Sequence, residues 1–422
     1  MTSLVGVVLA ILGTPLFIVI STVAILSFAA GDTDLTILFI EMYRLADTPT
    51  LTAIPLFAFT GFVLAASGAA GRLVQLSEAL LYWLPGGLAI MATVICALLT
   101  AFTGASGMTI VAVGGLLFPA MQQAGYQEKF TLGLLTTSGS IGLLFPPSIA
   151  LILYGIISET PVDQLFIAGI IPGILLVGTL AIYSYFKGEP RDLDRAQTAR
   201  GTTPPPRAVA SVRAAAWELL LPVVVIVGIY GGFIAVSEAA ALGALYILVI
   251  EMVVHREVRV RHLPGIMRET MVLVGAIFVI LGAALAYTSY MIDAEVPQSL
   301  LAFVEIHVNN RVVFLILLNL FLLAVGCLID MFSALIVVVP LILPLAAAFD
   351  VHPIHLGIIF LANLEIGYST PPVGLNLFIA SARFDRPILD LYRAALPFLG
   401  LLLIALLLIT YIPALSLVLV TE

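Results

Sequence analysis

The chain has 422 residues, of which 62% are hydrophobic and only 10% are charged, and its mean hydropathy is +1.19. Soluble globular domains carry about 25% charged residues, so this composition excludes a soluble protein and indicates a polytopic helical membrane protein. The net charge of −8 argues against nucleic-acid binding. The long apolar runs differ from the short alternating segments of a membrane barrel.

The first half begins with an apolar run at 4–29 that lacks a basic leader and a small-residue cleavage site. It is predicted to be a membrane span rather than a signal peptide. Further elements of this half follow in order: an apolar span at 51–67, an amphipathic stretch at 69–84, a split run at 87–120 that predicts a helical hairpin, a broken span at 130–157, and a closing span at 165–186.

The second half repeats this order at an offset of 225 residues. The most specific repeat is a skeleton of one glycine and three prolines, paired as Pro119 with Pro344, Gly142 with Gly367, Pro146 with Pro371, and Pro147 with Pro372. Glycine and proline interrupt helices, so the repeat is one of backbone interruptions. Matched interruptions in two halves of a membrane chain indicate a transporter binding site.

The predicted domain organisation follows from this alignment. It consists of a first repeat at 1–186, a polar linker at 187–216, a linking span at 217–232, and a second repeat at 233–422 with a hairpin at 312–345 and a broken helix at 355–382. The linker is rich in proline and basic residues and is expected to be a flexible cytoplasmic loop.

The distribution of charge predicts that the two repeats are inverted. Of the 17 Lys and Arg residues, 13 lie in the stretches 187–213, 256–268 and 383–393, which the positive-inside rule places in the cytoplasm. The loops 158–168 and 31–47, which match the last two stretches, are acidic instead. The N-terminus is therefore expected in the cytoplasm and the C-terminus in the periplasm.

Chemistry is expected where the hairpins turn, at Phe102–Thr109 and Gly326–Ser333, and where the two spans break. Proline frees backbone carbonyl oxygens that suit sodium, and half-helix N-termini suit a carboxylate. The alternative for any Ser or Thr is a bond back to its own helix or helix packing. Asp330, in an apolar environment, and Glu365 are intramembrane acids, which are functional by default, although Glu365 has structural pairing as an alternative.

Several segments carry a family resemblance. They are "IPLFAFTGFVLAASGAAGRLVQL", "LPGGLA", "GASGMTIVAVGGLLFPAMQQAGY", "SGSIGLLFPPSIALILYGI", "GIYGGFIAVSEAAALGALY" and "NLEIGYSTPPVGLNLFIAS". In order and spacing they resemble the large membrane subunit, of DctM type, of the tripartite ATP-independent periplasmic (TRAP) transporters. The resemblance runs from about residue 50 to residue 380.

The resemblance implies an all-α polytopic membrane protein with inverted repeats, two re-entrant helical hairpins and two broken helices, working as an elevator-type transporter. It also implies a bacterial or archaeal inner-membrane permease that imports an organic acid with sodium as the coupling ion. The implied partners are a small four-helix membrane subunit and a periplasmic substrate-binding protein. Neither enzymatic activity nor a further cofactor is expected.

The resemblance also implies site residues. The sodium-binding residues carried over are Thr103, Gly104, Ser106, Gly142, Asp330, Ser333, Gly367, Thr370 and Pro371. The residues expected to contact substrate are Thr136, Ser138, Pro147, Ser148, Asn363 and Asn376. Spans such as 4–29, 217–232 and 236–254 would form a static scaffold. The amphipathic stretches 33–48, 69–84, 258–269 and 295–308 would link it to the moving part.

This chain departs from the family pattern at the first hairpin tip, where Ala105 replaces a residue with a hydroxyl group. A family Thr-Pro-Thr-Glu-Ala motif reads Ala235 to Ala239 here, with only Glu238 and the final alanine retained, and no role follows for Glu238. The main rival interpretation is a stand-alone sodium- or proton-coupled anion transporter that needs no binding protein. A second rival interpretation is a channel or a membrane enzyme. No repeated filter motif supports a channel, and no cluster of His, Cys or acidic ligands supports an enzyme.

Overall fold

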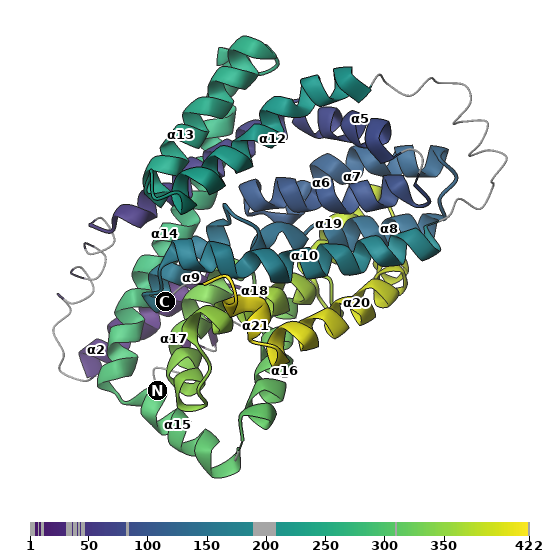
Figure 1. Ribbon diagram of the computed structural model, residues 1–422. Helices are drawn as coiled ribbons and strands as arrows, with labels where there is room; N and C mark the ends of the chain where they lie inside the picture. Colours follow the sequence, from purple (N-terminus) through teal and green to yellow (C-terminus); the bar gives the residue numbers. More distant parts are fainter. Residues whose placement is uncertain are drawn as a thin grey trace.

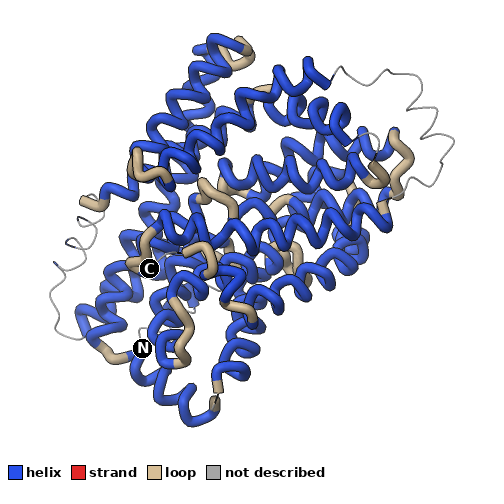
Figure 2. Tube along the Cα trace, viewed as in Figure 1, coloured by secondary structure: helices blue, strands red, loops and turns tan. Residues whose placement is uncertain are grey.

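The computed structural model describes residues 5–6, 8–9, 12–30, 36, 40, 43, 47–81, 84–188, 208–308 and 310–420. Over these residues the chain is helical and contains no strand (Figures 1 and 2). Eight helices are long and apolar enough to cross a membrane, or nine if one bent pair counts as a span, again within the described residues. The predicted amphipathic stretch 33–48 and most of the linker lie largely outside the described residues.

The described elements of the first half run from α2 to α10. Their bounds are α2 Leu16–Ala30, η1 Pro49–Thr52, α4 Ala53–Ala66, α5 Ala69–Leu81, α6 Gly87–Thr103, α7 Ser106–Gln123, α8 Glu128–Ser138, η2 Ile141–Leu144, α9 Ile149–Ser158 and α10 Val162–Lys187.

The remaining elements run from α12 to α21. Their bounds are α12 Ala208–Tyr230, α13 Val236–Val249, a π-helical turn η3 Ile250–Val254, η4 Val260–His262, α14 Leu263–Asp293, α15 Val296–His307, α16 Arg311–Leu328, α17 Met331–Ala348, α18 Pro353–Gly367, α19 Leu375–Phe384, α20 Ile388–Tyr411 and α21 Ala414–Leu417.

The helix bounds repeat with the same offset of 225 residues as the proline and glycine residues. Shifted by 225, the bounds of α7 coincide with those of α17, and those of α6 and α10 fall within one residue of α16 and α20. The Pro146–Pro147 and Pro371–Pro372 peptide bonds are both cis. The repeat of the sequence is therefore a repeat of helices and of their interruptions.

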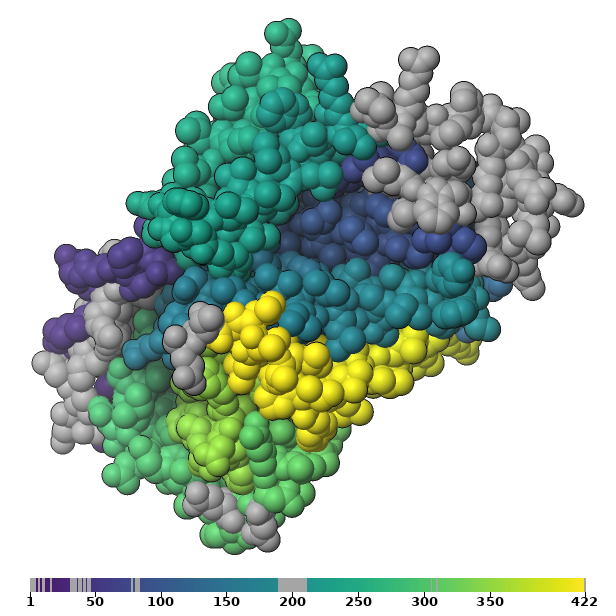
Figure 3. Space-filling model, viewed as in Figure 1, coloured from purple at the N-terminus to yellow at the C-terminus, as the bar shows by residue number. Residues whose placement is uncertain are grey.

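The two halves exchange packing partners. Helix α20 packs on α8 while its counterpart α10 packs on α18, and α19 packs on α7 while α9 packs on α17. In the same way α13 packs on α4 and α2 packs on α14. Figure 3 shows the yellow C-terminal helices lying directly against the blue and teal helices of the first half. This reciprocal pattern is what a pseudo-two-fold axis between the repeats produces.

The hairpins of the two halves differ in shape. Helices α6 and α7 pack along one another, whereas α16 and α17 diverge from their tip and are bridged at the far end by α15 (Figure 1). The α16 helix packs on α18 instead.

One boundary differs from the sequence prediction. The linker was expected to extend to residue 216, but helix α12 already begins at Ala208. The segment 208–216 reads "AVASVRAAA", and its five alanines outside the proline-rich part favour helix.

Backbones approach closely at glycine 142, which follows α8. A β-carbon at this position would lie 2.1 Å from the Ala97 carbonyl oxygen of α6. Glycine is required here because the obstructing atom belongs to the main chain and cannot rotate away.

We expect Gly142→Ala to lower stability by about 1–3 kcal/mol, because the added methyl group forces α6 and the η2 turn apart. The measurement is the melting temperature of the purified protein in detergent. Gly178→Ala in α10 is the matched control, since a β-carbon there meets no atom within 4 Å. Equal melting temperatures for the two variants would contradict this packing.

A buried charge cluster fixes α5 to the α12–α13 region (upper part of Figure 1). The Arg72 guanidinium donates to the carboxylates of Glu218, Glu251 and Glu257, each at 2.6 Å. Glu251 is fully buried, and Glu218 and Arg72 are at least nine-tenths buried. One arginine thus holds three carboxylates from α12, the η3 turn and the loop after it.

Partial burial raises the pKa of Glu257, but hydrogen bonds from Arg72 and from the Gly68 amide outweigh it, and the net pKa is lowered. A lowered carboxyl pKa contributes stability above the ordinary pKa of the group, and this stability is lost as the pH falls through the folded-state value. The bonds of Glu257 to Arg72 and Gly68 therefore hold α5 most firmly above the ordinary pKa of a carboxyl group.

We expect Arg72→Met to cost about 3–5 kcal/mol, because it leaves buried carboxylates without their cation. Unfolding in detergent, followed by circular dichroism at neutral pH, measures the loss. Arg268→Met, at an exposed position of α14, is the control and is expected to unfold like the wild type. If Arg72→Met left the free energy of unfolding almost unchanged, the cluster would not hold α5 in place.

Candidate functional site

The first hairpin turns at Gly104 and Ala105, between α6 and α7. Gly104 adopts a left-handed conformation with φ of +61°, which favours glycine, and Ile149 of α9 lies 3.0 Å from where its β-carbon would stand. The Ala105 amide donates to the Thr103 hydroxyl at 3.3 Å. The tip is therefore a tight turn pressed against the start of α9.

Threonine side chains tie this hairpin to the first broken helix. The Thr100 hydroxyl lies 2.7 Å from both the Gly139 carbonyl oxygen and the Thr109 hydroxyl. It donates to the carbonyl and accepts from Thr109. The carbonyl oxygen at the end of α8, which has no partner within its own helix, thereby receives a hydrogen bond from the hairpin.

The first tip also reaches the second half. The Ser106 hydroxyl donates to Oδ1 of Asn376, in α19, at 2.7 Å, and both side chains are buried. Two residues that sequence analysis assigned to different ligands, sodium and substrate, thus lie in direct contact.

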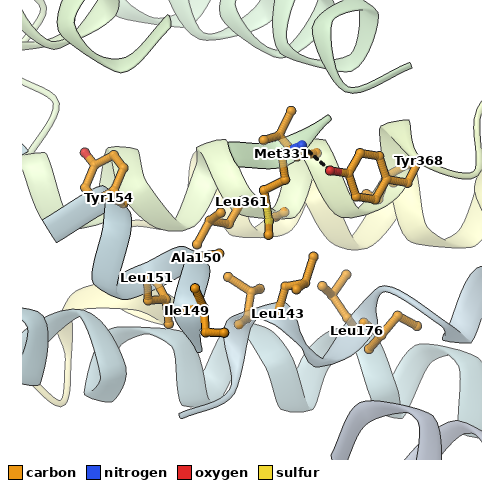
Figure 4. Packing of buried hydrophobic residues seen from close by; sticks show 14 of the residues in the cluster. Leu143, Ile149, Ala150, Leu151, Tyr154, Leu176, Met331, Leu361 and Tyr368 are labelled. Atoms are coloured by element: carbon orange, nitrogen blue, oxygen red, sulfur yellow. Dashed lines mark hydrogen bonds between the residues drawn. The ribbon is translucent and has the colours of Figure 1, made fainter. Parts of the chain in front are cut away.

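The second hairpin turns at Ile329 and Asp330 and rests on the second broken helix. The Met331 amide donates to the Tyr368 hydroxyl (Figure 4) and the Gly374 amide donates to the Cys327 carbonyl at 3.1 Å. Gly326 and Gly367 let α16 and α18 approach, since a β-carbon on Gly367 would lie 2.8 Å from Gly326.

Asp330 is exposed at the second tip, next to the exposed apolar side chains of Leu328 and Ile329. It forms the N-cap of α17, where Oδ1 accepts the Ser333 amide at 3.1 Å. The free amides at the start of a helix attract a carboxylate, which explains its position at the tip.

The two breaks meet at matched positions, Ser140 and Glu365, which are 225 residues apart. The Ser140 hydroxyl donates to the Glu365 carbonyl oxygen at 2.9 Å. In return Oε1 of Glu365 accepts the Leu144 amide at 3.1 Å. Figure 4 shows Leu143 and Ile149 of the first break facing Leu361 of α18.

Buried amides form a second polar group beside α18. Nδ2 of Asn363 donates to Oδ1 of Asn319 at 2.7 Å and to the Ile359 carbonyl at 2.8 Å. Asn363 Oδ1, Asn376 Nδ2 and the Ser369 hydroxyl have no hydrogen-bond partner among the described residues. Asn319 was missed by sequence analysis, although an amide inside an apolar hairpin was a usable signal.

Among the other expected site residues, Thr136, Thr370 and Ser148 are bonded locally. The Thr136 and Thr370 hydroxyls donate to the carbonyl oxygens four residues earlier, at 2.7 and 2.8 Å. The Ser138 hydroxyl lies 3.4 Å from that of Thr93, and Ser148 caps α9 by accepting the Leu151 amide. Pro147 and Pro371 belong to the two cis peptide bonds.

Glu238, for which no role was expected, accepts the Ala235 amide at 2.9 Å and so caps the start of α13. Cys96 and Cys327 are buried free thiols.

A cavity of about 1120 Å³ lies apart from these residues. It is lined by η1, the end of α9, the start of α10, the α12–α13 turn, the end of α14, α15 and α17. Its charged lining residues within the described chain are Glu159 and Asp163, and Pro340 and Pro344 of α17 form one wall. The expected site residues do not line this cavity.

The fold resembles that of a known transporter. The Alcanivorax borkumensis YdaH transporter, described as having an unusual topology, superposes with a TM-score of 0.64 over 91% of this chain and 89% of that chain, at 15% sequence identity. The shared feature is the fold alone. The architecture is thus that of an all-α polytopic membrane protein.

Sequence comparison gives the family. The model of the "Tripartite ATP-independent periplasmic transporter, DctM component" matches residues 4–415. The C4-dicarboxylate TRAP transporter large permease protein DctM of Pseudomonas aeruginosa is 36% identical over 90% of this chain and 88% of that protein. The ectoine TRAP transporter large permease protein TeaC of Halomonas elongata is 32% identical over 97% and 96%. The sialic acid TRAP transporter large permease protein SiaM of Vibrio cholerae is 33% identical over 88% and 86%.

The chain therefore belongs to the DctM family of TRAP transporter large permease subunits, as the sequence resemblance indicated. It is a multi-pass membrane transport protein and not an enzyme.

Proposed function

We propose that this permease imports an organic acid, coupled to sodium and dependent on a binding protein, by an elevator movement. The observation that supports this most is the hydrogen bond between Ser106 and Asn376, which joins the tip of one half to the broken helix of the other. Irregular backbone in a membrane is tolerated only where it is buried in protein or lines a cavity, and transporters use it to bind ions and substrate.

The proposed sodium ligands are backbone carbonyls and hydroxyls at the two tips. Within the described residues no group of three or more His, Cys, Asp or Glu is placed to hold a metal ion. Sodium, a hard cation, suits oxygen ligands of the kind offered by Thr103, Ser106, Ser333 and Thr370, together with the Asp330 carboxylate. The Thr370 hydroxyl donates a hydrogen bond to the Ile366 carbonyl oxygen, so the lone pairs of the hydroxyl oxygen remain available to a cation.

The moving part proposed here comprises α6–α9 and α16–α19, which carry the tips and breaks. The static scaffold comprises α2, α4, α12, α13 and α14, with α5 held to it by Arg72. The 1120 Å³ cavity lies at the boundary of the two parts, because α17 and α9 form one side and the α12–α13 turn and α14 form the other. Movement at this boundary is what an elevator mechanism requires.

The proposed partners are a small four-helix membrane subunit and a periplasmic binding protein. Exposed apolar side chains on α12 and α13, such as Val227 and Leu245, offer a face for the small subunit. From the basic stretches we infer a cytoplasmic location for the start of α12 and the α13–α14 loop, with the N-terminus in the cytoplasm and the C-terminus in the periplasm.

The proposed cargo is a carboxylate. The similar permeases are named for C4-dicarboxylate, ectoine and sialic acid transport. The proposed substrate contacts are Thr136, Ser138, Pro147, Ser148, Asn363 and Asn376. Of their amide groups, Nδ2 of Asn376 is a donor without a partner among the described residues and is free to bind a carboxylate oxygen.

We expect Thr370→Ala to raise the sodium concentration for half-maximal uptake by about tenfold, equivalent to about 1.4 kcal/mol for one lost ligand. The assay is uptake by proteoliposomes that contain the complete permease and its binding protein. Thr270→Ala is the matched control, because the Thr270 hydroxyl makes the same bond to the carbonyl four residues earlier, but in α14. Unchanged sodium dependence in Thr370→Ala would remove Thr370 from the site.

The same proteoliposomes separate this proposal from a stand-alone transporter. We expect uptake to stop when the binding protein is omitted. Sodium-driven uptake by the membrane chain alone would favour the stand-alone interpretation.

A further inference from the structure

The cluster that fixes α5 contains more carboxyl groups than cations. Arg72 faces Glu218, Glu251 and Glu257, and within the described residues it is the one lysine or arginine that pairs with them. The nearest further cation is His255, whose Nε2 lies 3.4 Å from Oε1 of Glu218. Even with His255 charged, three carboxyl groups therefore face two cations. At least one negative charge has no counter-charge if all three acids are ionised.

Water can compensate the charge of Glu257 but not that of the other two acids. The Glu257 side chain is 40% exposed, whereas the side chains of Glu218 and Glu251 are 3% and 0% exposed. Oε2 of Glu218 and Oε2 of Glu251 are both buried and have no hydrogen-bond partner in the described part of the chain. Burying an ionised carboxylate without a cation is far more costly than burying a neutral polar group. The buried pair is therefore expected to hold a proton.

The geometry around Arg72 selects Glu251 as the protonated member of this pair. Oε1 of Glu218 lies 2.6 Å from Nε and 2.5 Å from Nη2 of Arg72, and it also faces His255. Oε1 of Glu251 accepts one guanidinium hydrogen bond, from Nη2 at 2.6 Å. The cations are thus best placed to stabilise an ionised Glu218. A protonated Glu251 still accepts the Nη2 hydrogen bond through its carbonyl oxygen, and its hydrogen stands on Oε2.

No other charge on the neighbouring elements changes this balance. Glu251 lies in the η3 turn, which follows α13 and contacts α5 and α12 through Arg72 and Glu218. The remaining charged and titratable side chains described on these elements, on the loop after η3 and on η4 are Tyr246, whose hydroxyl donates to the Trp217 carbonyl oxygen, and the exposed residues Arg213, Glu238, Arg256, Arg259, Arg261 and His262. None of them forms an ion pair or a hydrogen bond with the Glu251 side chain.

We propose that Glu251 carries a proton on Oε2 at neutral pH, and that loss of this proton in alkaline solution loosens the attachment of α5 to α12 and the η3 turn. On deprotonation the O–H bond breaks, the carboxylate keeps the electron pair, and the proton passes to water at the exposed edge of the cluster beside Glu257. Glu218 and Glu251 then repel one another around a single guanidinium. Because α5 leads into α6 of the first hairpin, the cluster is a proton-sensitive joint between that hairpin and α12.

The pH dependence of stability tests this joint without a transport assay. The folded chain binds one proton more than the unfolded chain, in which an exposed glutamate is ionised at neutral pH, so this contribution to stability falls as the pH rises. We expect the melting temperature in detergent to fall between neutral and alkaline pH by about 2–4 °C more for the wild type than for Glu251→Gln. Glu269→Gln, at an exposed position of α14, is the control and is expected to behave like the wild type. Equal falls for wild type and Glu251→Gln would overturn the proposal.

Infrared spectroscopy of the same purified protein at neutral pH tests the protonation state itself. The wild-type minus Glu251→Gln difference spectrum is expected to show the carbonyl band of a protonated carboxyl group, and any other protonated acid cancels in the difference. The wild-type minus Glu269→Gln spectrum is expected to show carboxylate bands instead. Carboxylate bands in the Glu251→Gln difference would contradict the proton on Oε2.

A second variant gives an independent result. Glutamine has the shape and neutrality of protonated glutamate, so Glu251→Gln is expected to fold, and its failure to fold would contradict a neutral side chain at this place. Glu218→Gln removes the competing carboxylate and leaves the Arg72 cation to Glu251, which is then expected to ionise and lose its carbonyl band. A carbonyl band that persists in Glu218→Gln would show that excess negative charge is not what holds the proton.

Discussion

The structure depends on one constraint, which is that backbone groups freed inside a membrane need partners from elsewhere in the protein. At three interruptions of helices, residues of another element meet that need. The Thr100 hydroxyl donates to the Gly139 carbonyl. The Tyr368 hydroxyl accepts the Met331 amide, and the Glu365 carboxyl group accepts the Leu144 amide. The last of these contacts crosses between the repeats, and so does the bond between Ser106 and Asn376. Neither half is complete without the other.

The repeats agree in backbone and differ in chemistry. Helix bounds and the two cis peptide bonds recur with one offset. At matched positions, however, Ser140 stands opposite Glu365, and Ala105 of the first tip stands opposite Asp330 of the second. The first tip is buried and bonded across the axis, whereas Asp330 is exposed and caps its own helix. Two ion sites built on these tips would therefore differ in their ligands.

Sequence reasoning was strongest where the physical cause is local. Proline and glycine end helices wherever they stand, so Pro146, Pro371 and Gly104 located the breaks and the first tip. It was weaker where a contact joins distant residues. Arg72 pairs with Glu218 and Glu251, 146 and 179 residues away, and no local pattern indicates such partners. The start of α12 was missed because its alanine-rich first turns follow directly on a proline-rich linker.

The claim that the halves complete one another is tested most directly by a double-mutant cycle on Ser106 and Asn376. Free energies of unfolding would be measured in detergent micelles for Ser106→Ala, Asn376→Ala and the double variant. A direct buried hydrogen bond predicts a coupling energy of about 0.5–1.5 kcal/mol, so that the double variant loses less than the sum of the single losses. Additive losses would contradict the contact between the first hairpin tip and the second broken helix.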